Sequence, residues 1–330
     1  MISETKKEYI KFCNENKKKQ HIFHETWWLN STCGRDSWDV ALVKDNNRII
    51  AAFPYYFKRL FGFKILIQPP LTQKLGFFFT SENDYNLQKN NQKKYREIIS
   101  ELIDQLPKFS YFNQFFYSEI INWLPFFWKG FQQTSFYSYK IHDIRNKNIL
   151  DLFSKGKIKD LSKANKNFDL RYNDISPQEF YEHHKKSLKE KKQTIFYKLE
   201  TLEKIFFSIS KNKSGFVISA IDKKTGEIAA LLLTICDEND SYSIISSIAQ
   251  KYKKYAPLTL LFYNSIIESK KYSKNYDFEG GMDMKLGDSF RHMGGEPVEY
   301  YNIKKTSSSI LKVLIFCMNL IKFNKLRFVK

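Results

Sequence analysis

Apolar and polar positions alternate through the first 150 residues in a way that predicts short strands around one amphipathic helix. Turn residues such as Asp45-Asn46-Asn47 separate the apolar runs, as between neighbouring strands of a sheet. The predicted strands are residues 38–44, 48–57, 64–68, 111–117 and 132–141. Before the fourth strand, apolar residues recur at helical spacing, and Pro107 ends that helix. Its apolar positions are Tyr95, Ile98, Ile99, Leu102, Ile103 and Leu106.

The second half of the chain repeats this order of elements. A hairpin turns at residues 222–226, a third strand follows, and a helix opens at Pro257, a favourable first position. The predicted strands are residues 215–221, 227–235, 242–249, 276–279 and 297–303. Lysine-rich helices fill residues 150–213, where Ser176 and Glu179 form a capping box. The same order of elements twice predicts a tandem duplication.

The length of 330 residues and this repetition predict two domains and a tail. The first domain should span residues 1–147 and the second 148–306, divided by a polar stretch near 143–148. In the tail, residues 307–330, the apolar run Ile310–Ile321 is flanked by lysines and is too short to span a bilayer. We expect a helix that docks on the protein itself or, alternatively, rests on an anionic membrane surface.

The charge and the composition of the chain limit which classes of partner and cofactor we expect it to bind. Lys and Arg number 54 against 35 Asp and Glu, so the net charge is +19. This excess suits a phosphorylated cofactor, an RNA or a membrane surface, although a lysine-favouring coding bias would produce part of it. The four cysteines form no Cys-x-x-Cys pair, and the histidines show no metal-binding spacing, so we expect no metal. With no signal peptide or membrane span in the sequence, a cytoplasmic monomer is expected.

The densest cluster of reactive side chains follows the strand predicted at residues 276–279. Asp277 and Glu279 should point to one face of that strand, because side chains alternate. Two neighbouring carboxylates raise the pKa of one of them, which suits a catalytic base. Asp283, Lys285 and Arg291 follow as candidate substrate contacts. The alternative is that Glu279 pairs with a nearby lysine or arginine and only closes the end of the sheet.

Several segments in order resemble a bacterial family of two-domain acyltransferase-like proteins in the GNAT superfamily, related to the Fem peptidyltransferases. The resemblance implies an α/β fold with two tandem GNAT-like domains, each a mixed twisted sheet flanked by helices. It also implies an acyl donor bound chiefly in the second domain. Gln73, after a strand and two prolines, becomes a candidate substrate contact. The similar segments are His24–Asn30, Phe53–Tyr56, Gln68–Gly76, Gly156–Ala164 and Tyr276–Met282.

The resemblance places the donor's pyrophosphate at residues 249–257, before the helix that opens at Pro257. Users of coenzyme A carry glycines there, whereas this chain has none. The candidate donor contacts are therefore Gln250, Lys251, Lys253 and Lys254. A solvated basic loop is the alternative for these lysines.

Three functions follow from these observations. The first is an N-acyltransferase that moves an acyl group from acetyl-CoA or another acyl-CoA to an amine of a cell-envelope or polysaccharide precursor. The second is a Fem-like transferase that takes its acyl group from aminoacyl-tRNA. The third is a binding protein that keeps the fold without the chemistry. The sequence shows no zinc finger, basic zipper, P-loop or dinucleotide fingerprint, which argues against the classes that use them.

Overall fold

The computed structural model describes residues 2–16, 20–81, 86–120 and 122–317. Its first half contains α1 (Glu4–Glu15), η1 (Ile22–His24), α2 (Thr26–Cys33), β1 (Trp38–Asp45), β2 (Arg48–Leu60), β3 (Phe63–Ile67), β4 (Phe78–Phe79), α4 (Leu87–Asn90), α5 (Gln92–Asp104), β5 (Tyr111–Phe116), α6 (Leu124–Trp128) and β6 (Gln132–Ile141). The predicted helix and strands of this half are confirmed, with shifts of a few residues at their ends.

The second half opens with η2 (Ile144–Asn146). Its remaining elements are α7 (Ile149–Leu152), α8 (Lys155–Asn167), β7 (Phe168–Tyr172), α9 (Pro177–Glu190), α10 (Leu199–Asn212), β8 (Gly215–Asp222), β9 (Ile228–Cys236), β10 (Asp240–Ile248), η3 (Gln250–Tyr255), α11 (Pro257–Ser269), β11 (Asn275–Asp277), α12 (Met284–Arg291) and β12 (Glu296–Thr306). The lysine-rich segment, predicted to be helical over residues 150–213, forms four helices but also the short strand β7, which pairs with β8 at the edge of the sheet. The capping box predicted at Ser176 and Glu179 opens α9. A last helical stretch covers residues 309–317.

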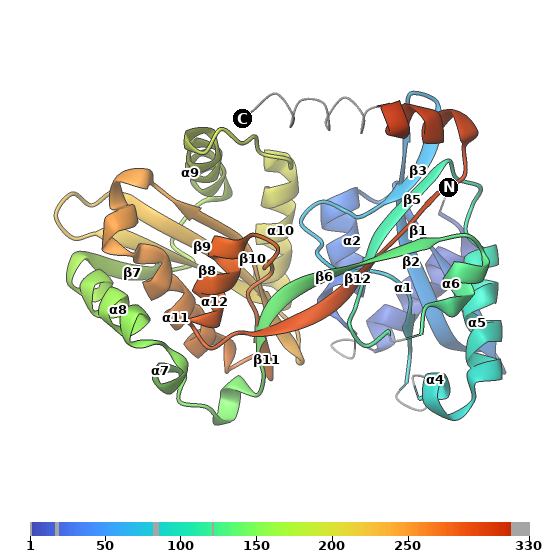
Figure 1. Cartoon of the computed structure of the whole chain (residues 1–330), viewed down its shortest axis with the longest axis horizontal. Helices are drawn as coiled ribbons and strands as arrows, with labels where there is room; N and C mark the ends of the chain where they lie inside the picture. The colour runs from blue at the N-terminus through green and yellow to red at the C-terminus, as the bar shows by residue number, and fades with distance from the viewer. Residues whose placement is uncertain (1, 17–19, 82–85, 121, 318–330) are drawn as a thin grey trace.

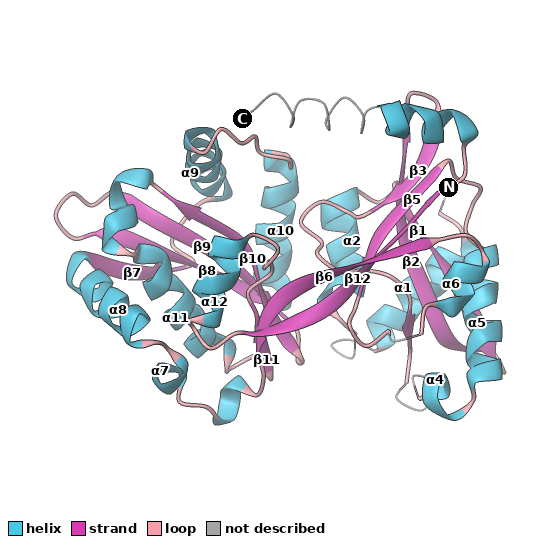
Figure 2. Ribbon diagram, in the orientation of Figure 1, coloured by secondary structure: helices cyan, strands magenta, loops and turns pink. Residues whose placement is uncertain are grey.

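The two halves repeat one topology. In each, three antiparallel strands are followed by a helix and a strand parallel to the third: β1–β2–β3, α5 and β5, then β8–β9–β10, α11 and β11. The described strands form one twelve-stranded sheet in the order β1-β2-β3-β5-β12-β6-β11-β10-β9-β8-β7, with β4 beside β2. Figures 1 and 2 show how β6 and β12 cross from one half to the other.

The closing strands of the two halves are exchanged. β6, which ends the first half, pairs with β11 of the second half. β12, which ends the second half, pairs with β5 and β6 of the first. The division predicted at residues 147 and 148 stays a prediction, since β12 lies in the sheet beside strands of the first half.

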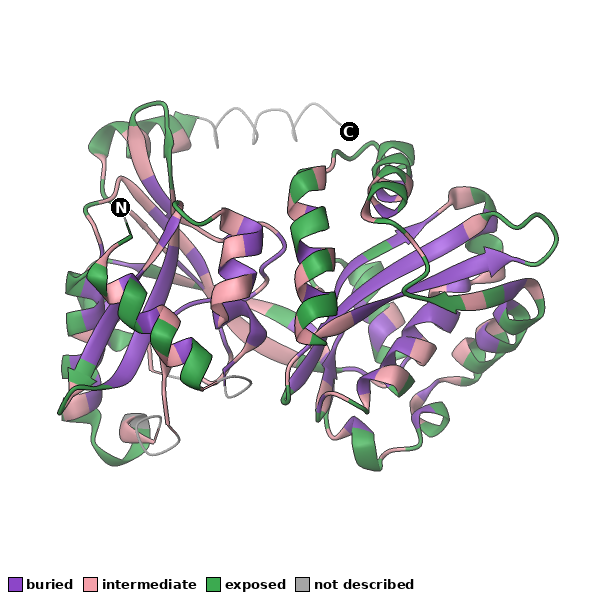
Figure 3. Ribbon diagram, turned by 180° about the vertical axis from the view of Figure 1, so that it is seen from behind, coloured by how far each residue is buried: buried purple, intermediate pink, exposed green. Residues whose placement is uncertain are grey.

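Helices cover both faces of the second half of the sheet. β9 is apolar except for Thr234 because both its faces are buried. Ala230 and Leu232 face α8 and α11, and Leu231 and Leu233 face α9 and α10. The core beneath α10 also takes in Phe23 and Trp28 from the first half, so the two halves share a buried surface. Figure 3 shows the buried strands between helices whose outer faces are exposed.

Candidate functional site

The strands β10 and β11 run side by side only where they begin. Residues 240–242 pair with residues 275–277, but β10 continues to Ile248 whereas β11 ends at Asp277. The pairing of β10 with β9 is irregular between Ser243 and Ile245, at the same level. Beyond this point the described residues place no strand beside β10 on that side. The sheet therefore opens directly after Asp277, and the strand predicted to reach Glu279 ends two residues earlier.

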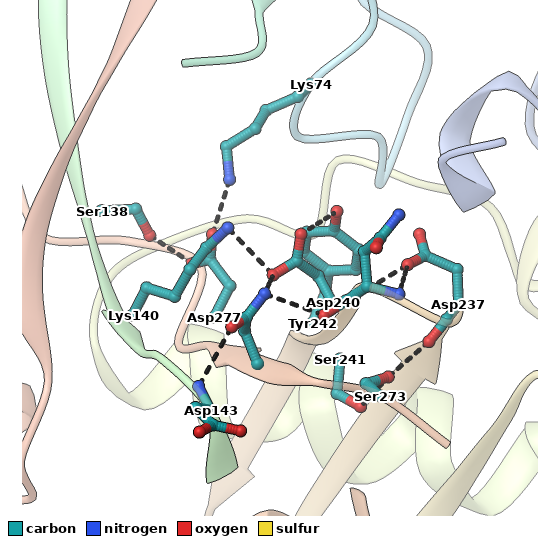
Figure 4. A network of polar contacts seen from close by, with 12 residues as sticks. Lys74, Ser138, Lys140, Asp143, Asp237, Asp240, Ser241, Tyr242, Ser273 and Asp277 are labelled. Carbon is teal, nitrogen blue, oxygen red and sulfur yellow. Dashed lines mark hydrogen bonds and ion pairs between the residues drawn. The ribbon is translucent and has the colours of Figure 1, made fainter. Parts of the chain in front are cut away.

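A buried lysine from the first half meets the two predicted carboxylates at this opening. The Nζ atom of Lys74 lies 2.7 Å from Asp277 Oδ2 and 3.3 Å from Glu279 Oε1. The three side chains are 7%, 1% and 4% exposed. Figure 4 shows Lys74 reaching Asp277 from the loop after β3, with Ser138 of β6 donating a hydrogen bond to the same carboxylate. The halves of the chain thus meet in an ion cluster.

A second buried pair completes the charge balance. Lys140 of β6 places its Nζ atom 2.9 Å from Asp240 Oδ1 at the start of β10 (Figure 4). The positive charges of Lys74 and Lys140 are therefore balanced by the carboxylates of Asp277 and Asp240, without a charge on Glu279. Buried charges are tolerated where they are paired and hydrogen-bonded, so the cluster favours a neutral, protonated Glu279.

The pKa shifts follow from this balance. Burial raises the pKa of Glu279 to about 8, helped by the charge of Asp277 and opposed by Lys74. Burial also acts to raise the pKa of Asp277, but Lys74 and Lys140 hold it below its ordinary value. For Lys74 burial acts to lower the pKa, and the carboxylates of Asp277 and Glu279 raise it instead. Asp277 and Lys74 are fixed charges, whereas Glu279 titrates close to neutral pH.

The backbone around Glu279 is unusual. Glu279 has a left-handed conformation with φ +52°, and its N–H donates to Asp277 Oδ1 at 2.9 Å. The strand alternation that we expected to align Asp277 and Glu279 is therefore wrong, and it is Lys74 that brings them together. At Gly281 a Cβ atom would lie 2.8 Å from the ring of Tyr139. A glycine at this position therefore lets the backbone pack closely against β6.

The loop that presents Lys74 is held at several points. The indole of Trp28 donates to Thr72 Oγ1 at 2.8 Å, and the N–H of Leu75 donates to Phe115 O at 2.7 Å. Gly76 has φ +71°, and a Cβ atom there would lie 2.6 Å from the ring of Phe116. Since left-handed backbone and close packing coincide at this position, the loop depends on glycine.

Gln73, the predicted substrate contact, lines a cavity of about 340 Å³ immediately before Lys74. The cavity lies against the prolines of this loop and the exposed ring of Phe196. Its other lining residues are Tyr56, Lys58, Ile67, Gln68, Leu71, Thr72 and Phe115.

The remaining predicted substrate contacts lie at α12 instead. Asp283 accepts hydrogen bonds from the first N–H groups of α12, Lys285 is exposed, and Arg291 pairs with Asp288 at 3.4 Å.

A larger cavity of about 830 Å³ lies between α2 and the C-terminal part of α10. Burial raises the pKa of Asp237, which lines it, to about 6, although His21 acts to lower it. Gln20 also lines it and has an Nε2 atom that is buried without a hydrogen-bond partner. Sequence reasoning did not point to this cavity.

The predicted donor loop is a short 3-10 helix, η3, rather than an open loop. The N–H of Gln250 donates to the carboxylate of Glu190 at 3.3 Å, and Lys251 pairs with Glu227. Ala256, in left-handed conformation at φ +56°, leads into α11 without a side-chain cap. Lys253 and Lys254 are exposed on η3, and Lys254 lies over the ring of Tyr255. One backbone amide and one lysine of this loop are thus already engaged by carboxylates.

No family model matches the sequence, and no curated protein does. Solved structures do match. FemX superposes with a TM-score of 0.61 at 10% identity, over 91% of this chain and 96% of FemX. L-PGS from Bacillus licheniformis superposes with a TM-score of 0.56 at 13% identity, over 96% of each chain. A tandem GNAT protein of the clavulanic acid biosynthesis pathway gives 0.52 at 8% identity, over 83% of this chain and 84% of that protein.

The chain has the two-domain GNAT/Fem-like fold. The fold class predicted from the sequence is confirmed, together with the resemblance that suggested it. The opening between β10 and β11, with Glu279 close to it, lies in the second half, where the resemblance led us to expect the acyl donor.

Two further observations concern metal ligands and membrane-spanning helices. Among the residues that the structure describes, no His, Cys, Asp or Glu side chains gather as metal ligands do. Within the same residues, no helix is both long and apolar enough to cross a bilayer.

Sequence reasoning missed the partners of the predicted carboxylates. Lys74 lies 203 residues from Asp277, and Lys140 pairs with Asp240 across two strands that only the fold brings together. A signal was nevertheless present, because Lys74 directly precedes the apolar run Leu75–Phe79 inside a segment that resembles the family. A buried lysine needs acceptors for its ammonium group, and a carboxylate is the partner that also balances its charge.

Proposed function

We propose that the chain is an N-acyltransferase that moves an acyl group from a thioester or ester donor to an amine. Glu279 carries the proposal, because it combines a pKa of about 8 with a position at the opening between β10 and β11. A group that titrates near neutral pH can both take and return a proton during a reaction. The fold shared with GNAT and Fem proteins supports the reaction class.

Each step of the reaction follows from ordinary acyl transfer. The amine reacts in its neutral form, whose nitrogen has a free lone pair, and ionised Glu279 takes one of its protons as the nitrogen bonds to the acyl carbon. The bond to the leaving sulfur or oxygen then breaks, and Glu279 gives that proton to the leaving group, which leaves a neutral amide. Lys74 acts as a positioning residue that holds Glu279 at 3.3 Å and offsets the charge of Asp277. Turnover should therefore rise as the pH passes through about 8.

Two donors remain candidates, acyl-CoA and aminoacyl-tRNA. The donor loop favours an ester donor without a pyrophosphate, because Glu190 accepts from the amide of Gln250 and Glu227 pairs with Lys251. A phosphate at these positions would meet carboxylates, and the loop lacks the glycines that let backbone approach an anion. The net charge of +19 suits tRNA as well.

Calorimetric titration of the purified protein with acetyl-CoA and with aminoacyl-tRNA, at low and moderate salt, tests the proposal. Saturable binding of either donor, followed by transfer to an amine, supports it, and steep salt dependence marks the tRNA. Glu279→Gln should bind the donor as the parent does and lose turnover. Transfer at the parent rate in Glu279→Gln would remove Glu279 from the chemistry. Binding of neither donor would favour a protein that keeps the fold without the reaction.

The donor loop can be tested separately. Replacing the three lysines of η3 with Ala should weaken donor binding about tenfold or more if the loop holds phosphate groups, and unchanged affinity would show that they are solvated. The lysines are Lys251, Lys253 and Lys254. A matched control is the triple change at the exposed lysines of α9, which lie outside the loop. These are Lys185, Lys186 and Lys189.

A further inference from the structure

Two segments far apart in the sequence lie side by side at one end of the first half. One is the tip of the β2–β3 hairpin, residues 58–64, and the other is the stretch 304–317 with its terminal helix. Ser110 connects them: its N–H donates to Lys64 O at 2.8 Å, and its carbonyl accepts from the N–H groups of Ser307 and Ser308. Figures 1 and 3 show the helix beside the hairpin in both views.

The hairpin tip presents an aromatic ring to solvent. Phe61 is 92% exposed, next to exposed Leu60. Phe61 and Gly62 both have positive φ, +49° and +81°, which is the turn geometry that normally selects Asn-Gly or Asp-Gly. A phenylalanine in left-handed backbone is strained by about 1 kcal/mol or more and gains no packing here. Nothing within the described fold therefore accounts for an aromatic side chain at this position.

The terminal helix presents an apolar stripe beside it. Ile310, Val313, Leu314 and Cys317 are spaced as i, i+3, i+4 and i+7, and all four are exposed. Leu311 and Ile315, on the opposite register, are the partly buried positions. Phe316 adds a further exposed ring. Over residues 309–317 the helix turns this apolar stripe outward, and the rest of the predicted tail, residues 318–330, lies outside the described residues.

Basic residues surround these apolar groups, and acidic residues are missing from both segments. The chain contains no Asp or Glu from residue 46 to residue 81, nor from residue 300 to its end. The cations on the two segments are Lys58, Arg59, Lys64, Lys304, Lys305 and Lys312. Lys305 donates to Lys129 O at 2.6 Å, and the exposed Lys58, Arg59 and Lys312 face solvent.

We propose that residues 58–64 and 304–317 together form a docking patch for an anionic lipid bilayer. Exposed apolar side chains surrounded by cations are what an interfacial surface needs, the former entering the acyl boundary and the latter meeting the headgroups. A second copy is disfavoured, because the same patch would place like charges against one another. An RNA would use the cations but would leave the apolar stripe in water.

The docking patch lies close to the 340 Å³ cavity that Gln73 lines. Lys58 and Tyr56 line that cavity and belong to the strand that carries the hairpin tip. At about 3.3 Å per residue, Lys58 lies roughly 10 Å from Phe61 along the strand. A docked protein would hold the cavity close to the headgroups. This step alone rests on the proposed function, in which Gln73 contacts the substrate.

Vesicle sedimentation with the full chain tests the docking patch without any acyl chemistry. We expect binding to vesicles of equal parts phosphatidylglycerol and phosphatidylcholine, and little binding to phosphatidylcholine alone. Phe61→Ser and Leu314→Ser should each lower the partition coefficient roughly tenfold. Arg59→Gln and Lys312→Gln should each lower it roughly fivefold.

The matched control is Phe127→Ser on α6, where the ring is 56% exposed but lies outside the patch. Phe127→Ser should bind vesicles as the parent does. The proposal is overturned if the parent ignores anionic vesicles, or if Phe61→Ser and Leu314→Ser bind as tightly as the parent. Sedimentation without lipid gives the remaining outcome: self-association that Phe61→Ser abolishes would assign the patch to a second copy instead. A failed donor titration would leave this result untouched.

Discussion

Replacing Glu279 with Gln should change how the stability of the protein depends on pH. The pKa of Glu279 is about 8 in the folded protein, against about 4.3 for an exposed glutamate in an unfolded chain. Between these values the native state holds a proton that the unfolded state has lost. Stability of the parent therefore falls as the pH rises, by up to about 1.4 kcal/mol per pH unit from this group. The contribution is complete below pH 4.3 and is lost above pH 8.

Gln imitates the protonated side chain and carries no such dependence. Parent and Glu279→Gln should differ by about 1 kcal/mol at pH 5, and the variant should be more stable by up to about 4 kcal/mol at pH 7.5. A gain in stability on removing a functional carboxyl is the usual sign of a site that is strained for its task. The left-handed backbone of Glu279 is common to both proteins and does not enter the difference.

Urea unfolding followed by tryptophan fluorescence at half-unit steps from pH 5 to 8 measures this difference. Glu203→Gln, at an exposed position of α10, is the control and should follow the parent at every pH. Parallel curves for the parent and Glu279→Gln would refute a buried, protonated Glu279. A variant less stable than the parent at pH 7.5 would show that Lys74 needs the ionised carboxylate, as in a closing ion pair without catalytic use.

Two further changes test the loop that carries Lys74. Lys74→Met should lower the free energy of unfolding by about 3–5 kcal/mol, because it leaves a buried carboxylate short of its partner. Adding Asp277→Asn should restore part of that loss, whereas additive effects in urea titrations would deny the contact. Gly76→Ala should destabilise by about 2–4 kcal/mol through left-handed strain and contact with Phe116. A thermal melt unchanged by Gly76→Ala would mean that the loop rearranges freely.

The sequence predicted the fold best where the structure of an element depends only on residues within that element. The α5 helix shows its buried face at helical spacing, and the continuous apolar run Ile228–Leu233 of β9 indicates that both its faces are covered. Ser176 and Glu179 mark the start of α9 by local hydrogen bonds alone. These features depend on residues within a few positions of each other, so no tertiary knowledge was needed.

Only part of the candidate site could be predicted, because its other residues are distant in the sequence and are brought together by the fold. Asp277 and Glu279 stood out because they are carboxylates close in sequence, but the lysine that pairs with both comes from the other half of the chain. The end of β11 at Asp277 was also hidden, since Phe278 continues the apolar pattern while its N–H pairs with Tyr139 outside the strand. The exchange of β6 and β12 leaves no trace in a pattern of apolar positions.

That exchange bears on how the protein is made. During synthesis β5 keeps one edge open until residues 296–306, which are made only after most of the second half, pair with it. Neither half can complete its sheet from its own strands, so shortened chains that stop before β12 should aggregate through the open edge of β5 rather than fold. Each half therefore depends on the other for a strand. A chain made of one repeat alone would fold only if its own closing strand paired within that repeat.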